Sequence, residues 1–305
     1  MSRAPQDAGA VSGHVGARVL IALLRGFQRL PLALQARIGS ALGALMYRVA
    51  SRRRRIALRN LALCLPDLSV AERERLARQH FGWLMRSLLE RGLLWFAPTR
   101  RLKRLIQVEG DVGLAERSDR PVMWLVPHFV ALDVAGVATQ LFQSRQVASI
   151  YQTQSNPVFD AAMRAGRLRF GLGEVFARSE RALPLVRAVR KGAAFFNLPD
   201  MDFGGRDAAF VPFFGVPAST LLAPARMARS LGMVVQPVIA EMLPGGQGYR
   251  VRFMEPWTDF PGDDDEAAAR RMNAWIEQRI RENPAQYLWV HRRFKTRPDG
   301  EASLY

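Results

Sequence analysis

The stretch WLVPHFVALDVAG, residues 124–136, joins an apolar run to a helical pattern and decides the fold class. The apolar run covers 121–127, and the helical pattern covers 130–143. Further short runs rich in apolar or β-branched residues follow at 147–152, 193–199, 234–241 and 249–256, and helical patterns at about 157–171, 180–191, 218–231 and 266–282. This alternation predicts an α/β domain with a largely parallel central sheet.

Polar side chains follow three of these runs at the point where each run ends. In an open parallel sheet, ligands bind beyond the carboxyl ends of the strands. The sequence therefore predicts a site made of the residues that follow the first three runs, which are His128, then Gln152 and Asn156, then Asp200, Asp202 and Arg206.

His128 and Asp133 have two interpretations. They are either a catalytic pair, or a histidine at the edge of a core beside a carboxylate that caps a helix. A histidine on a strand-to-helix turn and an aspartate in the first helical turn can come within hydrogen-bond reach, so we expect His128 to be a general base that Asp133 orients. The chain has no G-x-S-x-G elbow, and Cys64 falls in a distant helical segment. The nucleophile is then a substrate hydroxyl, which suits acyl transfer from a thioester.

Charge and cysteine content exclude some classes of protein. The single cysteine, Cys64, excludes an internal disulfide and a multi-cysteine zinc site. The net charge of +17 is uneven, because residues 1–110 carry 20 Lys and Arg against 6 Asp and Glu. A basic arm of this kind binds nucleic acid, an anionic membrane or an acidic protein. No nucleic-acid motif accompanies the charge, so we expect no nucleic-acid partner.

The apolar residues of the N-terminal third have helical spacing. Leu20, Leu23, Leu24 and Phe27 form one stripe, and a second apolar segment at 38–47 leads to RRRR at 52–55. Arginines interrupt every apolar run before it reaches the ~18–20 residues of a spanning helix, and no signal peptide is evident. The pattern predicts helices seated at a membrane interface. The alternative is an amphipathic helix that packs on the domain.

These patterns divide the chain into four parts. We expect a disordered N-terminus at 1–14, a basic helical region at 15–104, an α/β domain at 105–298 and a tail at 299–305. Within the helical region, Ser69 and Glu72 form a capping box that starts a long helix. We expect that helix to be structural, without polar residues that take part in chemistry.

Several motifs resemble one enzyme family. The H-x4-D spacing is typical of glycerolipid-type acyltransferases, and four further stretches resemble the late acyltransferases of lipid A biosynthesis, the lauroyl/myristoyl group: RRIALRNLALCLPDLS, NPVFDAAMRAGRLRFG, PDMDFGGRDAAFVPFFGVPAST and WVHRRFKTRP. The resemblance implies a glycerolipid acyltransferase-like fold with N-terminal helices on the membrane. It also implies transfer of an acyl chain from acyl carrier protein to a hydroxyl of an acyl chain on Kdo-lipid IV A, at the cytoplasmic face of a Gram-negative inner membrane. The chain departs from the family pattern at its arginine-broken N-terminal segment and at Met201.

The resemblance also suggests roles for individual residues. Arg164, Arg167 and Arg169 are candidates for binding the acceptor phosphates. The alternative for any one of them is an exposed arginine that contributes only to solubility. Asp200 and Asp202 belong to the loop near Arg206, which either orders arginines or contacts the acceptor. The structural alternative is an Asx-turn that shapes the loop. Phe213 is a candidate wall for the acyl chain, although a buried core loop would look the same. His291 and the arginines beside it bind phosphate or carrier protein, or are structural.

No metal and no cofactor are expected, because the remaining histidines have no ligand spacing and no Gly-rich nucleotide fingerprint follows a strand. Two other functions remain open at this point. One is an acyltransferase for another membrane glycolipid or amino-acid lipid. The other is a basic membrane-binding protein without catalysis, although the intact spacing of His128 and Asp133 argues against it.

Overall fold

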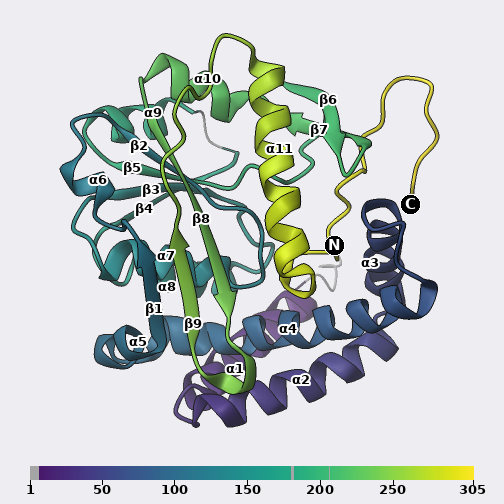
Figure 1. The fold of residues 1–305 in the computed structure, drawn as a ribbon. Coiled ribbons are helices and arrows are strands. Elements are labelled where there is room, and N and C mark those ends of the chain that lie inside the picture. Colours follow the sequence, from purple (N-terminus) through teal and green to yellow (C-terminus); the bar gives the residue numbers. More distant parts are fainter. Residues whose placement is uncertain (1–6, 180–181, 206) are drawn as a thin grey trace, which may run out of the picture.

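A seven-stranded sheet forms the centre of the molecule (Figure 1). The computed structural model describes residues 7–179, 182–205 and 207–305, so the predicted site residue Arg206 lies outside the described residues. The strand order is β1-β9-β8-β2-β5-β3-β4, from Ile106–Gly110, Tyr249–Phe253, Val234–Met242, Val122–Leu125, Ala194–Asn197, Val147–Tyr151 and Gly173–Ala177. All neighbouring strands are parallel except β8 and β9. The predicted α/β fold with a mostly parallel sheet is therefore confirmed.

Helices cover both faces of this sheet because the buried strands are apolar on both sides. In β2, Val122 and Trp124 belong to a hydrophobic core shared with α4, α7 and α8, whereas Met123 and Leu125 belong to one shared with α9, α10 and α11. This pattern is typical of parallel strands that are covered on both faces. The helices of the α/β part are α6 Leu114–Arg117, α7 Leu132–Leu141, α8 Pro157–Leu168, α9 Leu183–Arg190, α10 Ala223–Ser230 and α11 Asp265–Glu282.

Several parts of the secondary structure differ from the sequence prediction. The helix predicted over 218–231 is wrong in its first part, because Val216–Leu221 is strand β7 and pairs with β6, Ala208–Phe213, in a separate antiparallel hairpin. Strands β1, β4 and β6 were not predicted. Strands β1 and β4 lie at the edges of the large sheet, where polar and glycine residues face solvent and hide the apolar pattern.

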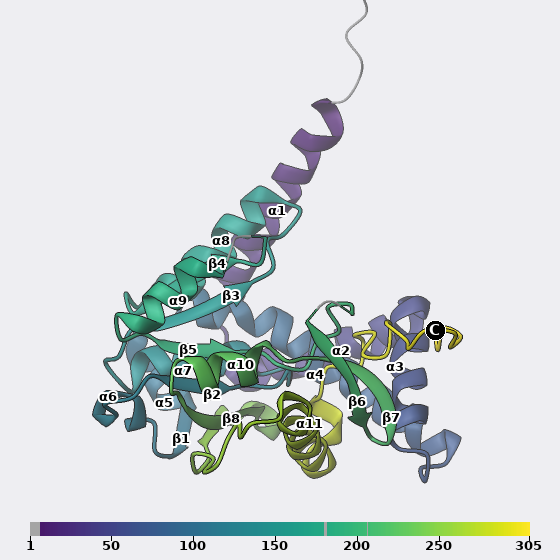
Figure 2. The ribbon, with the colours of Figure 1, turned by 90° about the horizontal axis from the view of Figure 1, so that it is seen from above.

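The N-terminal helices pack below and beside the sheet. They are α1 Asp7–Phe27, α2 Leu32–Val49, α3 Ser51–Cys64, α4 Val70–Phe96 and α5 Thr99–Leu105. The predicted capping box of Ser69 and Glu72 starts α4, which runs alongside α2 (Figure 1). The N-terminal end of α1 projects beyond the body of the protein (Figure 2). Helix α1 begins at Asp7, within the stretch 1–14 that was predicted to be disordered.

Among the described residues, no helix combines the length and the apolar character that crossing a bilayer requires.

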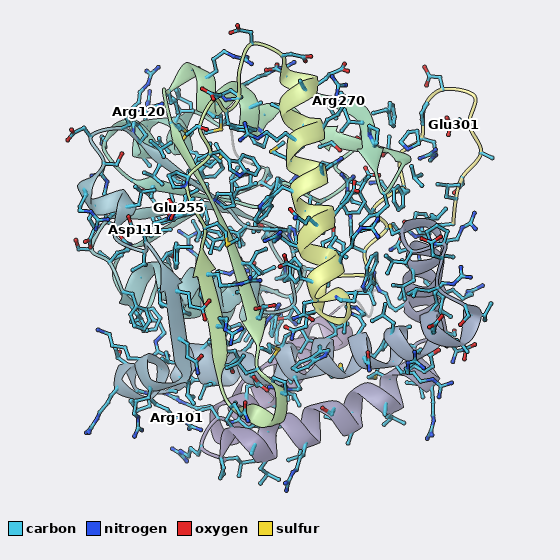
Figure 3. All side chains as sticks on the ribbon, viewed as in Figure 1. Arg101, Asp111, Arg120, Glu255, Arg270 and Glu301 are labelled. Carbon is cyan, nitrogen blue, oxygen red and sulfur yellow. The ribbon has the colours of Figure 1, made fainter. Side chains whose placement is uncertain are left out.

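The C-terminal segment, from residue 287 on, packs over the carboxyl end of β2. Tyr287 forms a β-bridge with Phe129, and the Leu288 amide donates to the carbonyl of His128 at 3.0 Å. Trp289 and Phe294 lie in a third hydrophobic core, which also includes residues of α3, α4 and α11. Side chains fill this interior, while charged residues such as Arg120 and Arg270 lie at the periphery (Figure 3). The C-terminal segment thereby fixes the backbone around His128.

Candidate active site

Strand register brings His128 and Asp200 together. Strands β2 and β5 are parallel neighbours, and Leu125 is paired with Asn197. His128 and Asp200 each come three residues after that pair, so they leave the sheet side by side at the same edge. The Val126 amide still donates to the Asn197 carbonyl at 2.9 Å, which keeps the two chain segments together beyond the last paired residues.

The two side chains form a direct hydrogen-bonded pair. His128 Nδ1 lies 2.7 Å from Asp200 Oδ1, and the His128 amide donates to Asp200 Oδ2 at 2.9 Å. Asp200 is buried and its carboxylate is an acceptor, so Nδ1 carries the proton and Nε2 is free to accept one. Burial alone would raise the pKa of Asp200, but the charge and hydrogen bonds of His128, with the charge of Arg293, lower it. The arrangement is that of a general base with its orienting carboxylate.

Asp133 has different partners from those that the sequence predicted. It lies in the first turn of α7, and its carboxylate lies 3.2 Å from Arg91 Nε of α4 and 3.0 Å from Arg167 Nη2 of α8. Burial opposes ionisation, but Arg167 and Arg91 lower the pKa of Asp133, and His128 is near enough to contribute. The structure therefore corrects the expectation that Asp133 holds the ring, because Asp200 occupies that position. Asp133 instead orders two guanidinium groups beside His128.

Two buried residues lie around Asp200, and one of them, Tyr287, was missed by the sequence analysis. The Tyr287 hydroxyl is near enough to Asp200 to interact with it, and the charge of Arg293 acts on the same carboxylate. Arg293 is buried and donates to the Ser219 carbonyl and to Thr220 Oγ1. Nothing in the spacing of the sequence pointed to Tyr287. Arg293 had been named with two alternatives, binding phosphate or carrier protein and a structural role, and its burial favours the structural one.

Asp202 ties the loop after β5 to the C-terminal segment. Its carboxylate accepts from the amide and the hydroxyl of Thr296, at 2.6 and 2.8 Å, and from the Gly204 amide at 3.0 Å. The last bond is the Asx-turn that was considered from the sequence. The Asp202 amide donates to Nε2 of His291, whose pKa falls to about 4 through burial and the charge of His128. His291 is therefore neutral near pH 7, and this pair supports the loop that carries Asp200.

Most of the other predicted substrate-binding residues have structural partners. Asn156 caps α8 by accepting from the amides of Val158 and Phe159. Arg169 donates to the carbonyls of Leu94 and Ala97 at the end of α4. Arg164 donates to the Val175 carbonyl, and Gln152 is exposed with only a local contact to the Thr153 carbonyl. Of the three predicted arginines, only Arg167 lies in the cluster beside His128.

Phe213 lies below the base in an aromatic core. It is fully buried, and it contacts Tyr287 and Phe294. It lines a tightly packed cavity, too small to hold a water molecule, together with His128 and, against the sequence expectation of a distant position, with Cys64. Burial strongly raises the pKa of the Cys64 thiol, so the sulfur stays protonated and is a poor nucleophile.

A second, apolar cavity lies beside the cationic cluster, which consists of Arg91 and Arg167 around Asp133. It holds about 60 Å³ of free space between the sheet and α4, α7 and α8. Its walls are mainly apolar and aromatic, and Asp133 and Arg167 also line it; the apolar members are Leu94, Trp95, Leu132, Val137, Val147, Ile150, Val175, Phe196 and Leu198. An apolar lining with a few polar groups at one wall is chemically suited to an apolar chain with a polar end.

The base, the cationic cluster and the apolar cavity form one constellation. His128 can take a proton from a substrate hydroxyl, because Asp200 stabilises the imidazolium that forms. Two guanidinium groups share the single carboxylate of Asp133, which leaves an excess of positive charge beside the base. These features suit a group transfer in which an apolar substrate develops negative charge at its head.

Comparison with known proteins gives one consistent family. Residues 12–296 match the family model of the bacterial lipid A biosynthesis acyltransferases. The chain is 34% identical to the lipid A biosynthesis lauroyltransferase of Escherichia coli over 280 residues, covering 91% of this chain and 90% of the relative. It is 33% identical to a lipid A biosynthesis acyltransferase of Haemophilus influenzae over 291 residues (93% and 92%). It is 31% identical to the lipid A biosynthesis myristoyltransferase of Escherichia coli over 294 residues (95% and 90%).

A double-mutant cycle can separate the roles of the two aspartates. Asp200→Asn should lower kcat by about 10³- to 10⁴-fold, because the amide no longer stabilises the imidazolium or fixes the tautomer. In the His128→Ala background the same substitution should cost little more, since the two residues act as a unit. Asp133→Asn should lower kcat by about 10²-fold by releasing the guanidinium groups, and this loss should persist in His128→Ala. Non-additivity of Asp133 with His128, together with additivity of Asp200, would reverse the assignment.

The Tyr287 hydroxyl should support the carboxylate of Asp200. Tyr287→Phe leaves that buried carboxylate with one polar neighbour fewer, so it should lower kcat by about 10-fold in steady-state kinetics. Tyr305→Phe removes another partly buried hydroxyl, which is bonded to Asn60, and should leave kcat unchanged. Equal losses in both variants would argue against the role of Tyr287.

Proposed function

The chain belongs to the bacterial lipid A biosynthesis acyltransferase family and is an acyltransferase of that pathway. From this premise, we propose that it transfers a fatty acyl chain from acyl carrier protein to a hydroxyl of an acyl chain on the Kdo-lipid IV A precursor. The single observation that carries this proposal is the bond between His128 Nδ1 and Asp200, which leaves Nε2 available as a base. An ordered dyad of this kind disfavours a membrane-binding protein without catalysis.

The proton follows a short path in this mechanism. His128 Nε2 takes the proton of the acceptor hydroxyl as its oxygen attacks the thioester carbonyl. The tetrahedral intermediate then expels the carrier thiolate, which the imidazolium protonates, so His128 returns to its starting state. Asp200 stays ionised throughout and stabilises the imidazolium. The buried, protonated Cys64 supports direct transfer to the acceptor without an acyl-enzyme intermediate.

Arg167 and Arg91 stabilise the negative charge of the tetrahedral intermediate. The acyl chain occupies the apolar cavity, so its thioester carbonyl lies at the cavity wall that Asp133 and Arg167 form. A guanidinium group held by Asp133 at 3.0 Å is already oriented when the oxyanion forms. Preorganisation of this kind typically contributes about 3 kcal/mol per donor. Asp133 is thus a positioning residue for the two arginines.

The N-terminal helices seat the enzyme on the cytoplasmic face of the inner membrane. Helix α1, whose N-terminal end projects from the body (Figure 2), exposes Val15, Val19, Leu20 and Leu23. Leu24 of the predicted stripe is instead buried against the domain, so α1 combines a packed face with an apolar solvent face. An exposed apolar face beside arginines is typical of an interfacial helix.

A reconstituted assay tests the proposed reaction. The purified protein, incubated with acyl-loaded carrier protein and Kdo-lipid IV A in detergent, should yield a product heavier by one acyl chain in mass spectrometry. His128→Ala serves as the inactive control. Transfer from acyl-coenzyme A at an equal rate would contradict the carrier-protein donor. Acylation of a phospholipid in preference to the lipid A precursor would contradict the acceptor.

The cavity should also set the length of the acyl chain. A Cβ at Gly136 would lie 4.0 Å from Phe196, so Gly136→Ala fits in ordinary contact, whereas Gly136→Leu projects into the cavity. Gly136→Leu should shift donor preference to shorter chains, by about four-fold in kcat/KM for each methylene displaced. Gly136→Ala should keep the original preference. Competition assays with mixed chain lengths measure both, and an unchanged profile in Gly136→Leu would place the chain elsewhere.

A further inference from the structure

A groove between α2 and α4 lies outside the site described above. The two helices and the short turn η1, Pro244–Gly246, enclose about 600 Å³ of open volume. The helices approach closely where they cross, because a Cβ at Gly43 would lie only 2.4 Å from the Gly82 Cα. The groove opens beside this crossing, and it shares no lining residue with the apolar cavity or with the cavity under His128.

Three guanidinium groups line the groove, and no carboxylate does. Arg86 is buried over the ring of Trp83 and is paired with Glu90 at 3.0 Å, and its Nη2 atom has no hydrogen-bond partner among the described residues. Arg78 lies over the ring of Tyr47 and is paired with the exposed Glu74 at 3.4 Å. Arg48 is exposed, and none of the ion pairs found in the described part of the chain involves it. The groove therefore carries excess positive charge.

An apolar stripe runs along α2 beside this charge. Leu34, Leu45 and Val49 are 40%, 51% and 62% exposed. Leu45 and Val49 lie one helical turn apart, and Arg48 stands next to them on the same face. Apolar side chains that flank an arginine suit the boundary between acyl chains and head groups of a bilayer.

We propose that the groove binds the phosphate group of a membrane lipid whose acyl chains lie in the bilayer against the α2 stripe. A guanidinium group binds two phosphate oxygens at once, and the rings of Tyr47 and Trp83 with Ala44 pack against the adjoining glycerol or sugar. The volume lies within the range of small-molecule sites. The proposal rests on the membrane seating proposed above, and it adds a defined phosphate site on α2 and α4. The phosphate belongs either to an anionic phospholipid or to the acceptor.

Vesicle binding of matched arginine pairs tests this site. Arg48→Gln/Arg78→Gln removes two charges at the groove, and Arg100→Gln/Arg104→Gln removes two exposed charges from α5. With vesicles of phosphatidylcholine containing a minority of phosphatidylglycerol, the groove pair should weaken binding about ten-fold or more, and the control pair about two-fold. Ala44→Phe fills the groove without changing charge and should also weaken binding, while circular dichroism confirms that each variant folds.

Acyl transfer in phospholipid-free detergent identifies the source of the phosphate. If the groove pair raises KM for the acceptor, the acceptor phosphate occupies the groove; if KM stays unchanged while vesicle binding falls, a phospholipid does. Both results support a phosphate site. Equal losses in the groove pair and the control pair, or wild-type vesicle binding by Ala44→Phe, would overturn it. Transfer activity in detergent reports separately on the proposed function. Arg48, Arg78 and Ala44 do not line the cavity under His128 or the apolar cavity.

Discussion

The hydrogen bond between His128 and Asp200 is the constraint on which the site depends. It joins two loops that leave neighbouring parallel strands in register, so the sheet itself fixes the separation of the two side chains. Burial of Asp200 would favour its neutral form, but the charge and hydrogen bonds of His128, with the charge of Arg293, lower the pKa of this carboxyl. The ring then has one defined tautomer, with Nε2 directed to accept a proton. The C-terminal segment contributes Tyr287 and pairs with the backbone at His128.

In the proposed mechanism the two aspartates divide the electrostatic tasks. Asp200 stabilises the protonated base, and Asp133 holds Arg91 and Arg167 for the negative charge of the reacting carbonyl. One carboxylate accordingly lies beyond a buried strand end and the other at the wall of the apolar cavity. The N-terminal helices are part of the same machinery, because α4 supplies Arg91 together with Leu94 and Trp95 of the cavity wall.

The sequence predicted the sheet, its strand ends and His128, because apolar runs and the residues that follow them are local patterns. It predicted the wrong partner for His128, since the closest aspartate in sequence is Asp133, whereas the partner in space comes from the neighbouring strand 72 residues away. Strand order decides that pairing, and a single sequence does not contain the order. Arg91 was hidden in a helix that looked structural, and Asn156 and Arg169 resembled ligand-binding residues although they cap helices. Edge strands β1 and β4 were missed because solvent exposure weakens their apolar pattern.

Nuclear magnetic resonance of the protein with ¹⁵N-labelled histidine tests the central claim most directly. The account predicts that the neutral ring of His128 carries its proton on Nδ1 and not on Nε2, with the Nδ1 proton shifted far downfield by Asp200. Asp200→Asn should abolish that downfield signal, and Asp133→Asn should preserve it. A ring protonated at Nε2, or a downfield signal that disappears in Asp133→Asn and survives in Asp200→Asn, would contradict the assignment of Asp200 as the carboxylate that orients the base.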